Sequence, residues 1–426
     1  MNYELLNIKN WDKNIDTSKN TDYIEIKEKT YRKILQKTDS ITIDDDNNSF
    51  VNNCLILTNP TINEDIKVFD KDPSVPVRIY KLIFDNCSLK KEELKNNPKT
   101  WLLTGCAGFI GSNILKELLK LNQKVIGIDN FSNGSISNLL EIKAFDYKNF
   151  TLKSIDIRNL ADLRRLFLDN EFDIVCHQAA IGSVPRSLDY PLDAHDNNVT
   201  GFVNVLELSK EFCIKNFVYA SSSSVYGESD DKIKTEGQEG KIISPYAATK
   251  CINEIYAKIY EECYDYKSIG LRYFNVFGPL QEKDSNYSTV IPKWINKILN
   301  KETLHIYGDG SISRDFCYVD NVVNANILSA TTDIKENKIY NVGCNGSNSL
   351  NDLYDKLENI AKQYGGMKMN KDYTNPRSGD VSATLANIDR ISEELKYEPE
   401  ILIDEGLENT FKYYYTKKYK EINNGF

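Results

Sequence analysis

The sequence lacks several features that would assign it to a special class of protein. No apolar run approaches the roughly 18 residues that span a bilayer, and the first residues lack the basic and then apolar pattern of a secretory signal. Nine cysteines are scattered without CxxC or Cys/His ligand spacing, which fits reduced thiols and predicts neither a disulfide framework nor a metal site. These absences predict a cytoplasmic protein that uses no membrane anchor and no metal.

Clustered positive charge is also missing. The 53 Lys and Arg residues are outnumbered by 62 Asp and Glu residues, so the formal net charge is −9. Because polyanion binding needs a basic patch, this balance argues against a nucleic-acid partner. The 426 residues are enough for one large α/β domain with an appendage, and no internal repeat is visible.

Residues 1–88 differ in composition and pattern from the rest of the chain. They combine acidic runs such as "TIDDDNNS" with short apolar strings such as "CLILTN" and "VRIYKLIF". We interpret them as a small appended α+β region whose role the sequence does not assign. The following segment "LKKEELKNNPKT" predicts a short helix and a turn into the main domain.

From Thr100 onward, strand and helix patterns alternate. The runs "TWLLTG", "KVIGIDN", "FDIVCHQAA", "FVYASSS" and "SIGLRYFNVFG" predict buried strands, with helices near residues 161–169, 197–212 and 246–264. This alternation predicts an α/β fold with a doubly wound parallel (Rossmann) sheet in residues 89–278. Shorter elements punctuated by proline and glycine then predict a smaller substrate lobe in residues 279–426.

The run "TGCAGFIG" places Gly105, Gly108 and Gly111 between the first strand and its helix. Glycine suits these positions because the turn is tight and the backbone must approach a pyrophosphate at a helix N-terminus. Asp129 ends the second strand, where a carboxylate accepts both ribose hydroxyls and repels a 2′-phosphate. The pattern therefore predicts NAD in preference to NADP.

Several further motifs carry a resemblance to a known family. "TGCAGFIGSN", "HQAAIGSVPRS", "SSSSVYG", "SPYAATK", "LRYFNVFG" and "SRDFCYVDNVV" together resemble an extended short-chain dehydrogenase/reductase that modifies nucleotide sugars. Within that family the chain is most similar to bacterial UDP-N-acetylglucosamine 4-epimerases, including those that act on the uronic acid form. The resemblance covers about residues 89–415 and implies NAD as cofactor and a UDP-sugar as substrate.

The resemblance also implies a set of residues around the cofactor. They lie in the glycine loop, at the ends of the next three strands and around the catalytic helix. The predicted cofactor-binding residues are Gly105, Gly108, Phe109, Ile110, Gly111, Asp129, Asn130, Ser132, Gly134, Asp156, Ile157, Gln178, Ala179, Ala180, Asn198, Tyr246, Lys250 and Tyr273.

Tyr246 and Lys250 are the predicted catalytic pair. They are one helical turn apart, so their side chains share a face, and a nearby ammonium favours the phenolate form of a tyrosine. We therefore expect Lys250 to lower the pKa of Tyr246. The register of the family selects Ser222 as the catalytic hydroxyl, with Ser223 beside it as a second candidate.

The positions after Ser222 argue against two neighbouring chemistries. Similar 4,6-dehydratases carry Asp and Glu directly after the catalytic threonine, and similar decarboxylases carry a Glu before "VYG". This chain has Ser223 and Ser224 there, and neither hydroxyl is a base for carbon 5 of the sugar. Oxidation and rereduction at carbon 4 is the chemistry that remains.

The predicted substrate contacts come from the same resemblance. Arginine suits a diphosphate because its planar fork matches the phosphate oxygens. A small residue at position 384, where relatives restricted to glucose and galactose carry tyrosine, is expected to admit a 2-acetamido group. The predicted substrate-binding residues are Ser183, Ser222, Asn275, Val290, Trp294, Arg314, Arg377, Asp380 and Thr384, with Arg186 as a further candidate sugar contact.

These residues favour a UDP-N-acetylhexosamine 4-epimerase. Epimerisation of UDP-N-acetylglucosaminuronate, with Arg186 or Lys293 near the sugar carboxylate, or of UDP-glucose stays open, as does a non-enzymatic NAD-binding scaffold. Relatives pair through two helices, which here correspond to residues 197–212 and 246–264, so we expect a homodimer.

Overall fold

The computed structural model describes residues 23–27, 42–43, 49–51, 54–57, 78–83, 86–229, 231–283, 288–365, 369–375 and 383–423. Contacts within the chain divide it into two compact units, Met1–Leu89 and Lys90–Phe426. Each unit is described by itself. The division of the chain into three functional parts stays a prediction.

The first unit contains a five-stranded sheet. Its strands are β1 (Tyr23–Lys27), β2 (Thr42–Ile43), β3 (Ser49–Val51), β4 (Cys54–Leu57) and β5 (Arg78–Ile83), in the order β1-β5-β4-β3-β2. The pairs of β5 with β1 and with β4 are parallel, whereas β2, β3 and β4 pair antiparallel. Helix α3 (Asn86–Asn96) follows and contains most of the predicted short helix.

The second unit is built on a seven-stranded parallel sheet. Its strands are β6 (Thr100–Thr104), β7 (Lys124–Asp129), β8 (Phe150–Ser154), β9 (Ile174–His177), β10 (Asn216–Ser222), β12 (Ile269–Tyr273) and β17 (Lys338–Val342). Their order is β17-β12-β10-β9-β6-β7-β8, and every pair is parallel. Strand order reverses between β6 and β9, and this reversal point is where doubly wound sheets bind their ligands.

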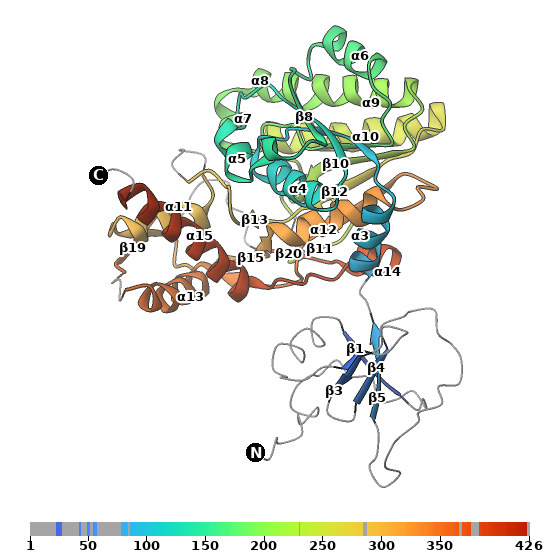
Figure 1. Ribbon diagram of the computed structural model, residues 1–426. Helices are drawn as coiled ribbons and strands as arrows, with labels where there is room; N and C mark the ends of the chain where they lie inside the picture. The colour runs from blue at the N-terminus through green and yellow to red at the C-terminus, as the bar shows by residue number, and fades with distance from the viewer. Residues whose placement is uncertain are drawn as a thin grey trace. The chain divides into compact units, whose positions relative to one another are not determined.

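Helices cover both faces of this sheet (Figure 1). Helices α6 (Leu160–Leu168), α9 (Gly201–Glu211) and α10 (Pro245–Tyr264) lie on one face, and α4 (Phe109–Lys120) and α12 (Val319–Ala330) on the other. Apolar side chains of α6, α9 and α10 form a core with the sheet; it includes Leu163, Phe167, Phe202, Leu206 and Tyr260. Both faces of the sheet are therefore buried, as near-continuous apolar strands require.

Shorter helices and strands lie in the connections between the strands of this sheet. They are α5 (Ile136–Glu141), η1 (Ala144–Asp146), α7 (Val184–Asp189), α8 (Pro191–His195), the π-helix η2 (Asp196–Thr200), η3 (Ser223–Tyr226), β11 (Ile233–Lys234) and β13 (Val276–Phe277). Serine and proline start several of them: Ser183 caps α7 and Ser244 caps α10, each directly before or near a proline in the first turn.

The C-terminal lobe has its own core. Its elements are α11 (Val290–Leu299), β14 (Leu304–Tyr307), β15 (Ser313–Arg314), β16 (Cys317–Tyr318), β18 (Asn348–Ser349), α13 (Leu350–Gln363), β19 (Lys371–Thr374), β20 (Ala383–Ala386), α14 (Asp389–Leu395) and α15 (Ile403–Asn423). Helices α11, α13 and α15 pack together around Ile295, Leu353 and Phe411. The small sheet β11-β20-β15-β18 connects the lobe to the loops of the main sheet.

The predicted α/β doubly wound sheet is confirmed, and two of its strands had no separate prediction. Strand β8 is short and mostly exposed, with alternate polar residues, so it lacks the apolar run that marks its neighbours. Strand β17 lies beyond residue 278 and adds the seventh strand to the sheet through the preceding helix α12. None of the described helices is long and apolar enough to cross a membrane.

Candidate active site

The glycine loop after β6 is shaped by close backbone contacts. Gly105 has a φ of +68°, and a Cβ added there would lie 2.8 Å from the backbone of Ala179. A Cβ on Gly111 would lie 2.0 Å from the carbonyl oxygen of Gly105. Side chains at these positions would collide with backbone that cannot move away, so the loop requires glycine. The bare backbone leads directly into the N-terminus of α4, which is capped by Gly108 without a side-chain hydrogen bond.

A pocket opens beside this loop, and we call it the loop pocket. Ten of the predicted cofactor-binding residues line it, and they come from the glycine loop and from the ends of β7, β8 and β9. The pocket is lined by Gly105, Gly108, Ile128, Asp129, Asn130, Ser132, Asn133, Gly134, Ile155, Ile157, Gln178, Ala179, Ala180, Ile181 and Asn197. Sequence reasoning missed Ile128, Asn133, Ile155, Ile181 and Asn197.

Asp129 lies in the loop pocket as a buried carboxylate. Its oxygens accept the backbone N–H groups of Ala107 at 2.9 Å and Phe131 at 2.8 Å. Burial raises the pKa of Asp129, and these two hydrogen bonds oppose that shift. Gly134 leaves the carboxylate uncovered, because a Cβ there would lie 2.8 Å from it. A buried acceptor reached past a glycine suits hydroxyl donors such as those of a ribose.

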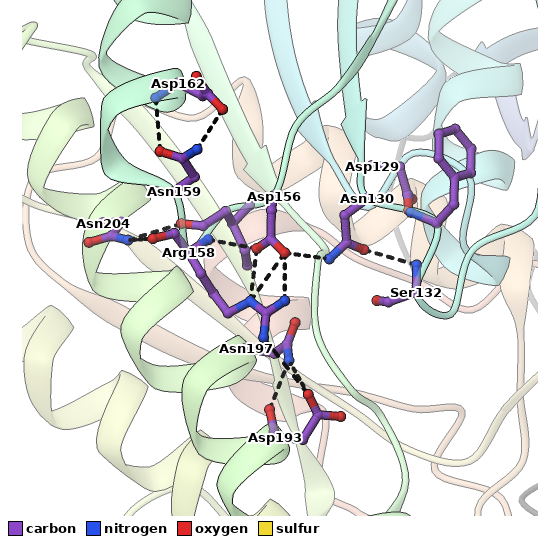
Figure 2. A network of polar contacts seen from close by, with 12 residues as sticks. Asp129, Asn130, Ser132, Asp156, Arg158, Asn159, Asp162, Asp193, Asn197 and Asn204 are labelled. Carbon is purple, nitrogen blue, oxygen red and sulfur yellow. Dashed lines mark hydrogen bonds and ion pairs between the residues drawn. The ribbon is translucent and has the colours of Figure 1, made fainter.

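Asp156 lies outside the pocket lining and holds a lining residue in place. Figure 2 shows its carboxylate between Asn130 and Arg158. The side-chain amide of Asn130 donates to Asp156 at 2.9 Å, and Arg158 Nη2 donates at 2.6 Å. The guanidinium of Arg158 keeps the pKa of Asp156 well below its usual range. Asp156 is therefore an ionised anchor for the loop after β7.

Asn198 and Tyr273 do not line the loop pocket, but each hydrogen-bonds to a residue that does. The Asn198 side chain accepts the N–H of Ile181 at 2.8 Å and donates to Thr249 at 3.0 Å, so it fixes the loop after β9. Tyr273 donates its hydroxyl to Gln178 at 3.0 Å, which connects β12 to a residue of the pocket lining. Phe109, Ile110 and Gly111 form the first turn of α4, and none of the three lines the pocket.

The predicted catalytic residues come together at the end of β10. Ser222 is the last residue of that strand, and Tyr246 and Lys250 lie near the start of α10. The side chain of Ser222 acts on Tyr246 and favours its phenolate. Lys250 is buried and donates to the carbonyl oxygen of Ala220 at 2.7 Å. The structure thus joins a strand and a helix that are more than twenty residues apart in sequence.

The electrostatics of this group differ from the expectation for Tyr246. We expected Lys250 to lower the pKa of Tyr246, whereas burial raises it and Ser222 only opposes the rise. Burial also lowers the pKa of Lys250 from its ordinary value of 10.5 to about 8, against the attraction of Glu254. The reason is desolvation, which disfavours the charged form of both groups. A positive charge bound next to them would favour the phenolate.

Two contacts that position the catalytic helix were not predicted from the sequence. Ser187 in α7 accepts the N–H of Tyr246 at 3.0 Å, so it satisfies a free donor in the first turn of α10. Glu254 accepts two hydrogen bonds from Arg272 of β12, at 2.9 and 2.7 Å, and one from Ser221. A buried ion pair therefore fixes α10 against the strands that carry Ser222 and Tyr273.

The described contacts of Ser223, Ser224 and His177 are structural, and a catalytic role of Ser223 stays a prediction. Ser223 and Ser224 start the short helix η3, which Ser222 caps by accepting the N–H of Ser224 at 3.1 Å. His177 is buried, its Nδ1 lies 3.0 Å from the hydroxyl of Thr104, and burial lowers its pKa to about 3. It is a neutral core histidine at physiological pH.

A second pocket lies in the C-terminal lobe, and we call it the lobe pocket. It brings together the predicted residues Asn275, Val290, Trp294 and Arg314, and it adds three basic side chains, Lys293, Lys297 and His305. Its full lining is Asn275, Val276, Phe277, Ser288, Thr289, Val290, Ile291, Lys293, Trp294, Lys297, His305, Tyr307, Ile312, Arg314, Phe316 and Leu350. A lining that combines apolar and aromatic side chains with basic ones fits an anionic ligand that carries a flat ring.

Individual contacts place the polar residues of the lobe pocket. The Asn275 amide donates to the carbonyl oxygen of Asp315 at 2.9 Å, and its φ is +30°. Arg314 lies in β15 between Asn348 of β18 and Thr384 of β20. The backbone of Thr384 is therefore next to Arg314. Arg377 and Asp380 lie outside the described residues, as does the side chain of Thr384.

Ser183 and Arg186 are not at either pocket surface. Ser183 caps α7 by accepting the N–H of Arg186 at 3.2 Å. The guanidinium of Arg186 donates to Asn133 and to Asp193, both at 3.4 Å. Arg186 therefore lies beside the loop pocket, and its role as a sugar contact stays a prediction.

Comparisons with known proteins agree with this geometry. The family described as "NAD dependent epimerase/dehydratase family" matches residues 101–343. Protein CapI of Staphylococcus aureus is 34% identical, covering 75% of this chain and 99% of that protein. The UDP-glucuronate 4-epimerase of Thermodesulfobacterium geofontis is 35% identical, covering 73% of this chain and 94% of the relative.

A solved structure is similarly close. The UDP-N-acetylglucosamine 4-epimerase from Methanobrevibacter ruminantium, in complex with UDP-N-acetylmuramic acid, is 37% identical and has a TM-score of 0.69. The match covers 75% of this chain and 99% of that one. About a quarter of this chain therefore has no counterpart in a relative that is matched almost completely.

Proposed function

Because this chain belongs to the NAD-dependent epimerase/dehydratase family, we propose that it interconverts UDP-N-acetylglucosamine and UDP-N-acetylgalactosamine. The family gives the cofactor, and the UDP-sugar 4-epimerases among its relatives give the class of enzyme. The observation that carries the proposed chemistry is the group formed by Ser222, Tyr246 and Lys250. The non-enzymatic scaffold is less suitable, because a scaffold needs no serine that acts on a tyrosine next to a buried lysine.

The loop pocket fits NAD. Its glycines leave the backbone of the β6 turn bare at a helix N-terminus, which is what a pyrophosphate requires. Asp129 offers a buried carboxylate to ribose hydroxyls. When bound, NAD supplies the oxidising and then reducing partner for a carbon atom of the sugar. In this proposal the residues of the loop pocket hold NAD, and Tyr246, Lys250 and Tyr273 contact it next to the catalytic helix.

The chain itself provides the proton transfer. Tyr246 acts as the base that takes the proton of the sugar 4-hydroxyl, and Ser222 hydrogen-bonds to Tyr246 and steadies that proton. Lys250 stays fixed by the carbonyl oxygen of Ala220 and stabilises the phenolate as it forms. After the 4-keto sugar turns to present its other face, Tyr246 returns the proton. No net oxidation occurs in this sequence.

The lobe pocket holds the nucleotide end of the substrate in this proposal. Arg314 neutralises the diphosphate, and Asn275 orients it from the turn after β12. Val290 and Trp294 of α11 pack against the uracil ring. Arg377 and Asp380 stay predicted partners of the diphosphate and ribose. Because the nucleotide is held by the lobe, the sugar is free to turn above Tyr246.

Two residue choices support the proposal, one of them for the 4-epimerase chemistry and the other for the N-acetylated sugar. Ser223 and Ser224 provide no carboxylate, so water loss at carbon 5 has no acid or base there. Thr384 is a small residue, and its backbone lies next to Arg314 in β15. A 2-acetamido group therefore has room where a tyrosine would exclude it.

A uronic acid form of the substrate is the second candidate. Lys293 lines the lobe pocket together with Arg314, and a relative of comparable identity is a UDP-glucuronate 4-epimerase. An ammonium there could pair with a sugar carboxylate. Arg186, the other basic residue considered for this role, is occupied by Asn133 and Asp193.

The deciding experiment is a substrate panel on the full chain. Purified protein is incubated with UDP-N-acetylglucosamine, its uronic acid form, UDP-glucose and UDP-glucuronate, and the 4-epimers are separated by chromatography or identified by NMR. We expect the highest kcat/KM for UDP-N-acetylglucosamine, and a loss of about 10²-fold or more in kcat for Tyr246→Phe. Turnover of none of the four, or equal rates for Tyr246→Phe and the wild type, would refute the proposal.

A further inference from the structure

We propose that four charged side chains outside the loop pocket position three of its lining asparagines and thereby set how firmly the protein holds NAD. The four are Asp156, Arg158, Asp193 and Arg186, and we call them the charged chain. This inference rests on NAD as the cofactor of the proposed function and does not depend on the identity of the sugar.

Each of three pocket-lining asparagines contacts one member of the charged chain. Asn130 donates its side-chain amide to Asp156 at 2.9 Å, and Asn197 donates to Asp193 at 3.0 Å. Asn133 accepts from Arg186 at 3.4 Å. All three asparagines line the loop pocket, whereas the charged residues do not. The charged residues therefore act on the pocket from behind.

The members of the charged chain contact one another in alternating sign. Arg158 lies 2.6 Å from Asp156 and 3.9 Å from Asp193, and Arg186 lies 3.4 Å from Asp193. Figure 2 shows three members of the charged chain, Asp156, Arg158 and Asp193, together with the lining residues Asn130 and Asn197. It joins the loop after β7, the end of β8 and helices α7, α8 and η2.

This arrangement fixes the asparagines before any ligand arrives. The amide of Asn130 is held at both ends, because its oxygen also accepts the N–H of Ser132 at 3.0 Å. Asn197 donates to the carbonyl oxygen of Asp193 at 2.8 Å as well as to its side chain. A side chain that is already immobilised loses less entropy when it binds a ligand, so preorganisation increases affinity.

The alternative is that these are ordinary surface ion pairs with no effect on the pocket. Their side chains are 23–40% exposed, and such pairs usually contribute little to stability. The chain offers a matched control for this reading, the pair of Arg164 on α6 and Glu211 on α9, with side chains 41% and 42% exposed. Neither control residue lines the loop pocket.

The test measures the dissociation of NAD from the full chain with no sugar present. Wild type, Asp193→Asn and Arg164→Gln are loaded with NAD, and its release is followed at about 0.05 M and about 0.5 M salt. We expect Asp193→Asn to release NAD about three to ten times faster than wild type at low salt. Added salt should speed release from wild type and Arg164→Gln but change Asp193→Asn little, because its charged chain is already broken.

A second variant separates this role from a direct sugar contact. Arg186→Met is expected to speed NAD release, since it removes the contact with Asn133, and to leave the KM for the sugar unchanged at saturating NAD. A raised KM with unchanged NAD release would overturn the proposal in favour of a sugar contact. So would wild-type release rates for Asp193→Asn at both salt concentrations.

Folding defects are excluded by the same samples. Each variant is first compared with wild type by circular dichroism and thermal unfolding without NAD, and Asp193→Glu is included because it keeps the charge. Partial return of slow release in Asp193→Glu supports the positioning role. Because the measurements of NAD release contain no sugar, failure of the proposed epimerase activity would leave them unchanged.

Discussion

Lys250 shows how a single residue is placed at the expense of stability. It is 2% exposed, its ammonium has one described hydrogen bond, to the carbonyl oxygen of Ala220, and its pKa is about 8. The fall from 10.5 corresponds to about 3 kcal/mol against the charged form at neutral pH. Strongly shifted groups of this kind are concentrated at functional sites.

We predict that Lys250→Met makes the cofactor-free protein more stable and inactive. Removing the desolvated charge raises the free energy of unfolding by up to about 3 kcal/mol. Loss of the hydrogen bond to Ala220 lowers it by about 1 kcal/mol. Urea unfolding at neutral pH should therefore give a free energy of unfolding about 2 kcal/mol above that of wild type.

The sign of the pH dependence follows from the lowered pKa. Between pH 8 and 10.5 the unfolded chain still binds the proton that the folded chain has released, so the stability of wild type rises across this range. The advantage of Lys250→Met should shrink accordingly between neutral pH and about pH 10. A variant that is less stable than wild type at neutral pH would contradict this account of Lys250.

At the scale of elements, helix α10 is the part on which the site depends most. It carries Tyr246 and Lys250 at its start, and the buried pair of Glu254 and Arg272 fixes its middle to β12. Removing one partner of a buried pair leaves the other charge uncompensated, which costs several kcal/mol. Arg272 also pairs with Glu239 at 2.6 Å, which limits the loss.

We predict that Glu254→Gln lowers stability by about 3 kcal/mol and the unfolding temperature by about 4 °C. The matched control is Glu262→Gln on the same helix, which breaks the exposed pair with Lys258 and should shift the midpoint by less than about 2 °C. Differential scanning calorimetry of the three proteins checks this. Equal midpoints for Glu254→Gln and Glu262→Gln would show that the buried pair does not fix the helix.

The outer face of α10 is the predicted dimer contact. Ile255 and Ile259 are 60% and 42% exposed and share one face of the helix, and Tyr256 is exposed beside them. We predict a homodimer in solution that the double change Ile255→Glu with Ile259→Lys converts to a monomer. Light scattering measures the mass, and Leu168→Glu, at an exposed leucine of α6, is the control. A wild-type protein of one chain mass would rule out this contact.

At the scale of the whole molecule, the described pockets and both large cores lie in the unit Lys90–Phe426. Relatives are matched along 94–99% of their own length by about three quarters of this chain. About a quarter of this chain is therefore additional to those relatives, and the family model matches residues 101–343, which lie in the second unit.

We predict that a chain beginning at Asn86 keeps the kcat and the NAD affinity of the full chain within about twofold. The reason is that no pocket or catalytic residue described above precedes Lys90. Parallel substrate panels and NAD titrations on the two proteins check this. A loss of more than tenfold in kcat would show that the first unit takes part in catalysis.

Sequence predicted the fold class, and the positions of some site residues in it, where one local pattern decides the outcome; the roles of those residues stay predictions. The glycine loop, Asp129 and the helix spacing of Tyr246 and Lys250 each follow from neighbouring residues, and the fold class follows from alternating apolar runs. The charged chain could not be predicted, because Asp156, Arg158, Arg186 and Asp193 meet only through tertiary packing. The predicted lowering of the Tyr246 pKa was wrong for a similar reason. Desolvation depends on what surrounds a side chain, and helix spacing does not show those surroundings.

The π-helix η2 has a consequence for how this protein tolerates changes in length. It inserts one residue into the helical run from Pro191 to Glu211, and two neighbours there serve different partners: Asn197 contacts Asp193, and Asn198 holds Ile181. A π-turn takes up one more residue than an α-turn, so deleting one residue would restore regular winding and remove one of these two neighbouring positions, and one of the two partners would lose its contact. Substitutions in this segment are therefore milder than a deletion, and the number of residues between Tyr190 and Gly201 is as constrained as their identity.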